Sequence, residues 1–199
     1  MIGIMSYLKK AENSEENYSD KLLKEYGVFS RSEYENSPLR TKLANGTPYR
    51  EEFQRILKRD NLTIDFSKQT RNTDDYGGLL DNKGKIVPDG NYIWINNTQD
   101  KFRFTPYKNQ DGNRNMHAVI SEGYSIYGAG ESLIENGKII MANTKTGHYV
   151  PIDFQSKLSK KNKKRILDEF NNQGKRVFES NAKKYGLNLE DICWNFNTY

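Results

Sequence analysis

The two histidines of the chain, His117 and His148, lie within one stretch that runs from residue 117 to residue 151. Histidine titrates near neutral pH, so its ring can serve as a general acid, a general base or a ligand. Both residues border glycine-rich turns, where the lack of a side chain lets a ligand approach the backbone. The pair is therefore a candidate catalytic site. The structural alternative is that each ring bonds a neighbouring backbone carbonyl and holds a turn in place.

Glu131 is the third candidate catalytic residue. It follows the small-residue turn Gly128-Ala129-Gly130, where a carboxylate can orient a histidine or bind a ribose hydroxyl. A solvated charge at a strand end is the alternative. We predict a catalytic set of His117, Glu131 and His148, in which one histidine is the general base and the carboxylate orients it. The predicted ligand-binding residues are Tyr149, Thr146, Asn143 and Gly130.

Each ligand-binding candidate also has a structural explanation. Tyr149 would stack on a base or a nicotinamide-like ring, or else form part of the core. Asn143 and Thr146 bracket the turn before Gly-His-Tyr and would otherwise only cap it. The Gly-Ala-Gly segment has neither the Gly-x-x-x-x-Gly-Lys-Ser/Thr pattern of a phosphate-binding loop nor a helix directly after it. A tight strand crossing or a bulge is thus the alternative role of Gly130.

Metal binding and cysteine catalysis have little support in the sequence. The histidines show no His-x-x-x-His spacing, so we predict no metal site, and the residues indicate no particular cofactor. Cys193 is the single cysteine, which leaves no intrachain disulfide and fits a reducing compartment. Its neighbours in "ICWNF" indicate apolar packing rather than a nucleophile.

The chain is predicted to be cytoplasmic, in the cell that makes it or in a target cell. No run approaches the roughly 18 apolar residues of a membrane span. The apolar start "MIGIMSYL" is short, and two lysines follow it rather than precede it, unlike the order in a signal peptide.

Hydrophobic periodicity predicts an α+β fold with N-terminal helices, a central antiparallel sheet of about five or six strands, and C-terminal helices packed on the sheet. We expect a helical segment over residues 1–60, with helices at 14–27 and from Pro48, followed by a core domain over residues 61–199. The expected strands cover residues 62–66, 91–95, 101–107, 117–121 and 147–152, together with the hairpin 131–143. Asn136-Gly137 has the composition of a type I′ turn for that hairpin.

The C-terminal part of the chain is predicted to be helical over residues 159–186. Gly174 is expected to break or kink this helix, and Gly186 is a natural C-cap. The closing segment 188–196 is expected to pack back on the sheet.

Basic residues are concentrated between Lys157 and Arg176. This segment holds eight lysines and arginines against Asp168 and Glu169, a net charge of +6, whereas the whole chain carries +5. An anionic partner should therefore meet this segment first. The run Lys160–Arg165 lacks interleaved aromatic residues that would stack on bases, so the expectation is a solvated helix face with weak contact to an anionic surface or nucleic acid.

Four sequence blocks resemble a domain shared by plant IQ-motif calmodulin-binding proteins, fungal relatives and bacterial effector-like or toxin-like proteins. "HAVISEG" stands in the place of that family's His-Ser-Ser-Phe and glycine, "GAGE" of Ala-Ala-Gly-Glu, "ENGKI" of its hairpin, and "TGHYVP" of Ser-Gly-His-Tyr-x-Pro. The resemblance covers residues 80–194. Ala118 and Val119 replace the two serines, so a role for those hydroxyls is not carried over. Calmodulin binding is not carried over either, because no IQ motif is apparent.

Two functions are consistent with these residues. The first is an effector- or toxin-like domain whose pocket, lined by the catalytic set and Tyr149, acts on or binds a nucleotide-like or protein substrate. The second is a non-catalytic accessory protein, of a phage or pathogen, that binds a macromolecular partner or a metabolite. Convergence of His117, Glu131 and His148 on one open cleft favours the first function. Dispersed side chains, or buried ones with satisfied partners, favour the second.

Overall fold

The computed structural model describes residues 43, 45–59, 62–68, 72–146, 149, 160–190 and 192–196. Within these ranges the chain forms one six-stranded sheet with helices against it. The elements in chain order are α3 (Tyr49–Arg59), β1 (Ile64–Asp65), β2 (Gly90–Asn97), β3 (Phe102–Pro106), α4 (His117–Ile120), β4 (Ile126–Glu135), β5 (Lys138–Ala142), α6 (Lys160–Lys184) and β6 (Cys193–Trp194).

The sheet confirms the expected α+β class but changes the expected strand directions. The strand order is β1-β3-β2-β4-β5-β6. Neighbouring strands are antiparallel except β5 and β6, which are parallel. The prediction of a wholly antiparallel sheet is therefore wrong at β6. The connection from β5 to β6 contains the long helix α6, and a crossover of this length returns the chain to the same end of the sheet.

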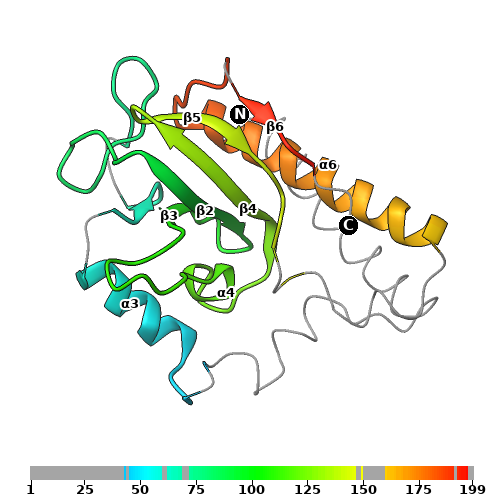
Figure 1. The fold of residues 1–199 in the computed structure, drawn as a ribbon, viewed down its shortest axis with the longest axis horizontal. Coiled ribbons are helices and arrows are strands. Elements are labelled where there is room, and N and C mark those ends of the chain that lie inside the picture. Colours follow the sequence, from blue (N-terminus) through cyan, green and yellow to red (C-terminus); the bar gives the residue numbers. More distant parts are fainter. Residues whose placement is uncertain are drawn as a thin grey trace.

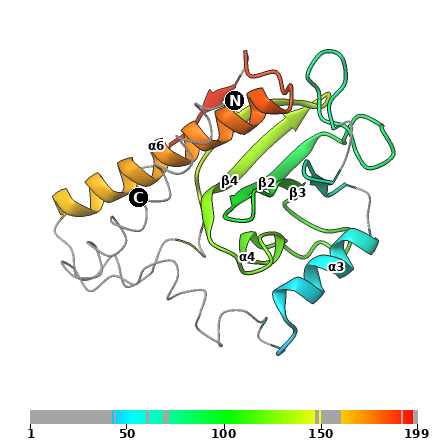
Figure 2. The same ribbon diagram turned by 180° about the vertical axis from the view of Figure 1, so that it is seen from behind.

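Helices cover both faces of the sheet. In Figures 1 and 2, α6 lies along one face, whereas α3 and α4 lie at the other. Successive residues of β2 point to the two layers in turn, as side chains of a strand do. Tyr92 and Trp94 join the core cluster that includes Phe178 of α6, and Ile93 and Ile95 join the cluster formed with α3 and α4.

The turns follow the chemistry of their residues. Asn136 and Gly137 both have positive φ, 51° and 76°, as the predicted type I′ hairpin requires. Four other loops share one arrangement, in which the side-chain Oδ1 of an Asp or Asn accepts the backbone N–H of the residue four positions later. These loops begin at Asp74, Asp81, Asn97 and Asn109.

Residues 117–121 were predicted to form a strand, and this prediction is wrong, because His117–Ile120 form the helical turn α4. A four-residue apolar run does not distinguish a buried strand from a buried helical turn by its periodicity. Long-range contacts decide between them here. The carbonyl of Ile120 accepts a hydrogen bond from Arg103 Nη1 at 2.7 Å, and the chain leaves the turn with positive φ at Glu122.

The C-terminal helix α6 continues through Gly174, so the break predicted there does not occur. This glycine instead permits close packing, since a Cβ on it would lie 2.7 Å from Thr144 Cγ2. Gly186 has a φ of 73°, in agreement with its predicted role as C-cap. Beyond it, Leu189 and Trp194 pack on the core as expected.

Two further predictions concern the N-terminal part and the strand after residue 146. The helix that was expected to start near Pro48 is present as α3. The helix expected at residues 14–27 lies outside the described residues, and so does the strand expected at 147–152, apart from Tyr149. The division of the chain at residue 60 stays a prediction.

Arg103 of β3 is a fully buried cation that joins four parts of the fold. Its Nε donates to Asp65 Oδ2 at 2.8 Å, and its Nη2 donates to Glu122 Oε1 at 2.8 Å. The third nitrogen, Nη1, donates to the Ile120 carbonyl, and the guanidinium lies 4.3 Å from the centre of the Phe53 ring. Since a buried charge is tolerated only when it is paired and hydrogen-bonded, this geometry fixes β1, α4 and α3 relative to β3.

We expect Arg103→Met to lower the free energy of unfolding by about 3–5 kcal/mol, because Asp65 then stays buried without its cation and the half-buried Glu122 is left with the exposed Arg50, at 3.6 Å. Urea denaturation followed by circular dichroism measures the change. Arg114→Met is the matched control: Arg114 is exposed and lies 5.3 Å from the Tyr107 ring centre. This variant should lose less than about 1 kcal/mol. Equal losses in the two variants would contradict the structural role of Arg103.

Candidate functional site

His117 is the first residue of α4, and its ring is held inside the protein. The residue is 7% exposed, and its Nε2 lies 2.9 Å from the carbonyl oxygen of Gly130. A carbonyl only accepts, so Nε2 carries the proton in this bond. The bond ties α4 to strand β4. His148 lies outside the described residues, so its position relative to His117 stays a prediction.

Gly130 lies at a point where two backbone segments almost touch. A Cβ on this residue would lie 1.8 Å from the carbonyl oxygen of Asn143, a distance that no side chain tolerates. The same oxygen accepts a hydrogen bond from the indole Nε1 of Trp94 at 3.1 Å. Gly130 thus lets the chain after β5 cross close over β4, which is the alternative role that its sequence context suggested.

Asn143 holds this crossing together. Its Oδ1 accepts the backbone N–H groups of Glu131 and Lys145, each at 2.9 Å. Its backbone N–H donates to the carbonyl of Glu131, also at 2.9 Å. Asn143 is buried, so its side chain satisfies backbone groups that would otherwise lack partners. This is the capping role that the sequence offered as the alternative to ligand binding.

Glu131 is the half-buried member of the candidate set. Its Oε2 lies 3.4 Å from Asn143 Nδ2. Because Glu131 pairs with Ile93 across the β2–β4 ladder, both side chains point to the same face of the sheet. Ile93 belongs to the core cluster of α3 and α4. Glu131 therefore lies on the sheet face that α4, with His117, covers.

The Tyr149 hydroxyl forms hydrogen bonds with residues near the end of α4, and the sequence did not predict these partners. It hydrogen-bonds the Ser121 hydroxyl and donates to the Tyr124 carbonyl at 3.1 Å. Ser121 directly follows α4, and its burial depends on the helical turn that was predicted as a strand. Thr146 is also buried, and its hydroxyl has no partner within the part of the chain that the structure describes.

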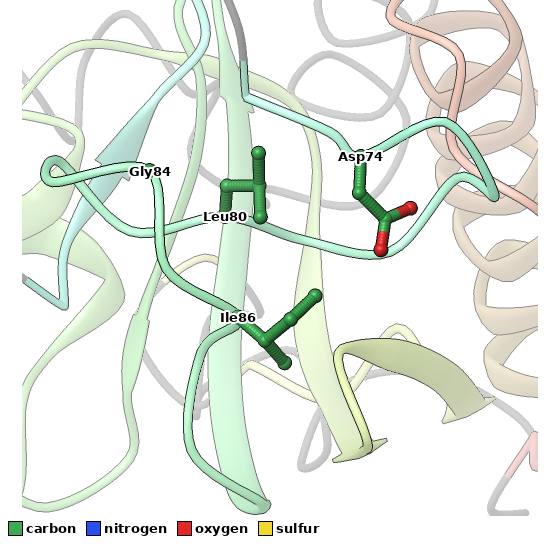
Figure 3. A pocket seen from close by; sticks show the side chains of 4 residues that line it. All are labelled: Asp74, Leu80, Gly84 and Ile86. Carbon is green, nitrogen blue, oxygen red and sulfur yellow. The ribbon is translucent and has the colours of Figure 1, made fainter.

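A surface hollow of about 450 Å³ lies elsewhere, between the loops that begin at Asp74 and Asp81. Its lining consists of Asp74, Leu80, Gly84 and Ile86, and Figure 3 shows how these residues lie on the two loops. The Oδ1 of Asp74 already accepts two backbone N–H groups of its own loop, from Tyr76 and Gly78. None of the predicted site residues lines this hollow.

Across the described ranges, no group of three or more His, Cys, Asp or Glu side chains is arranged to hold a metal ion. No helix in the same ranges has both the length and the apolar character that a membrane crossing needs. The structure thus brings His117, Glu131, Asn143 and Gly130 together around one backbone crossing. The side chains of His117 and Asn143 hydrogen-bond main-chain groups there, and Gly130 lies against the main chain.

No protein-family model, curated protein or solved structure matches the chain. The resemblance of residues 80–194 to the IQ-motif-related domain therefore stays a hypothesis based on its sequence blocks.

We expect Gly130→Ala to lower the free energy of unfolding by about 3 kcal/mol, because the new methyl group forces the backbone of Asn143 and Thr144 away from β4. Gly84→Ala is the control, since Gly84 has open space around its Cβ position but a φ of 74°. This control should lose about 1 kcal/mol from backbone strain alone. Thermal unfolding of both variants compares them, and a smaller loss for Gly130→Ala would contradict the crossing.

Proposed function

We propose that the protein is a non-catalytic binding protein that contacts an anionic macromolecular partner through helix α6. The observation that carries this proposal is the state of His117, whose ring is buried and bonded to the Gly130 carbonyl. A general base must reach a substrate proton, and a ring in this position joins two elements of the fold instead. Asn143 and Gly130 support the same conclusion, since both serve the backbone crossing.

Helix α6 supplies the charge for binding. Its 25 residues include nine lysines and arginines and three acids, a net charge of +6. The whole chain carries +5, so the remainder carries −1. Among the residues with described side chains, Lys160, Lys164 and Arg176 are exposed. A concentrated positive surface attracts polyanions and speeds their association.

We expect the protein to bind a labelled DNA duplex, used as a generic polyanion, with an affinity that falls as salt rises. The double variant Lys160→Gln/Lys164→Gln should bind more weakly, and its plot of log affinity against log salt should be shallower by about 2, because two cations no longer displace counterions. Fluorescence anisotropy at several salt concentrations measures both effects.

The matched control is Lys83→Gln/Lys138→Gln, which removes two exposed lysines that lie outside α6. Its affinity and salt dependence should equal those of the unaltered protein. An equal loss in both double variants would show that net charge rather than α6 determines binding, and absence of polyanion binding would overturn the proposal.

An effector- or toxin-like enzyme is the second candidate, and the half-buried carboxylate of Glu131 favours it. Glu131 shares a sheet face with His117, and the Ser121 and Tyr149 hydroxyls lie at the end of α4. In this hypothesis Glu131 orients a histidine toward a nucleotide-like or protein substrate, as the resemblance to effector-like proteins suggests.

A thermal-shift screen against nucleotides and dinucleotides tests the second candidate. If a nucleotide binds at Glu131, it should raise the melting temperature by a few degrees at saturating concentration, because ligand bound to the folded state stabilises it. Glu131→Gln should abolish that shift while the unliganded protein keeps its melting temperature. A shift that survives Glu131→Gln would place the ligand elsewhere.

A further inference from the structure

The fold brings two aromatic rings beside the basic helix. Trp194 of β6 lies next to Lys175 of α6, whose Nζ is 5.6 Å from the centre of the indole ring. Phe196 stacks on Trp194, with ring centres 5.5 Å apart and planes 11° from parallel. Figures 1 and 2 both show β6 alongside α6. The aromatic residues missing from the basic run in the sequence are thus supplied by another part of the chain.

This pair of rings packs against the core but remains partly accessible. Trp194 meets Phe178 of the core edge to face, at 5.3 Å between ring centres. Trp194 and Phe196 are half-buried, and the Lys175 side chain is 37% exposed. A ring that is anchored on one side and open on the other loses little conformational entropy when a flat ligand stacks on it.

Three lysines of α6 lie on the side of the helix that faces these rings. At 100° per residue, Lys160, Lys164 and Lys175 fall within about 60° of one another around the helix axis. Two acids, Asp168 and Glu179, lie beside this stripe, at about 80° and about 100° from Lys160 around the axis, and Glu179 lies 3.7 Å from Lys175. The helix is about 37 Å long, and its N-terminal half extends past the sheet in both views (Figures 1 and 2).

We propose that this basic-aromatic surface, formed by Lys160, Lys164, Lys175, Trp194 and Phe196, binds single-stranded nucleic acid. The inference rests on the proposed function and names its partner. Phosphates lie along the lysines of α6, and an unpaired base stacks on the exposed part of Phe196. Aromatic rings next to a positive helix are the combination that binds single strands, because every base offers a flat face to stack.

The surface discriminates against the two other polyanions that a basic helix attracts. Bases of a duplex are already stacked and do not reach Phe196, so a duplex gains only the phosphate contacts. A membrane surface attracts the lysines but has no flat ring to stack on the parallel pair of Trp194 and Phe196. The single strand alone uses both the charge and the rings.

Binding of labelled oligothymidylate, oligouridylate and a DNA duplex, measured by fluorescence anisotropy at matched salt, tests the inference. We expect the single strands to bind more tightly than the duplex. Phe196→Leu should weaken single-strand binding by about five- to a hundredfold, the loss of one stacked base, and leave duplex binding unchanged. Tyr76→Leu, which removes an 81% exposed tyrosine outside the surface, should change neither.

Two further measurements use groups of the surface directly. The fluorescence of Trp194 should be quenched by oligothymidylate, and Trp94→Phe identifies this signal because Trp194 is then the remaining tryptophan. Glu179→Gln should tighten single-strand binding, since Lys175 is then released from its ion pair. The Glu179 side chain is 43% exposed, so we expect this variant to keep the fold.

The outcomes separate this inference from the proposed function. Equal binding of duplex and single strands, with no effect of Phe196→Leu, overturns the inference and leaves an α6-mediated anion-binding protein. Tighter binding to vesicles of phosphatidylserine and phosphatidylcholine than to either oligonucleotide also overturns it. Failure to bind any of these polyanions overturns both.

Discussion

The buried guanidinium of Arg103 determines how the second layer is placed on the sheet. Its three hydrogen-bond acceptors are Asp65 of β1, the Ile120 carbonyl of α4 and Glu122, which follows α4. The ring of Phe53 in α3 covers the face of the guanidinium. An unpaired charge here costs several kcal/mol, so these acceptors must stay in position together. The α4 carbonyl faces Arg103 only when residues 117–120 form a helical turn. The position of His117, and hence its bond to Gly130, follows from this requirement.

Two residues of the stretch that suggested a catalytic site, Gly130 and Asn143, form a backbone crossing. Gly130 makes room for the Asn143 carbonyl, Trp94 donates to that carbonyl, and the Asn143 side chain binds two backbone N–H groups. The half-buried carboxylate of Glu131 contacts the Asn143 side chain, with Oε2 and Nδ2 3.4 Å apart.

Local chemistry made much of the fold predictable, and long-range contacts account for the rest. The Asn136-Gly137 turn, strand β2 and helix α3 follow from residues within each element, so the sequence predicts them. The helical turn α4 depends on Arg103, and the parallel direction of β6 depends on the path of α6. The residues within α4 and β6 therefore do not predict either feature. The contact between Lys175 and Trp194 is also long-range, so the sequence did not predict it. For His117 the sequence offered a backbone carbonyl as one alternative but did not identify Gly130.

The four loops that begin at Asp74, Asp81, Asn97 and Asn109 have a consequence for how this protein can vary. In each loop the first residue closes the turn with its own side chain and also bonds the residue four positions later through its backbone. The backbone segments on the two sides of each closure are therefore anchored in the same way, provided that the fourth residue of the loop adopts a positive φ, as Gly77, Gly84, Asp100 and Gly112 do. At the other tip positions the side chains can vary without displacing the backbone segments that each closure joins.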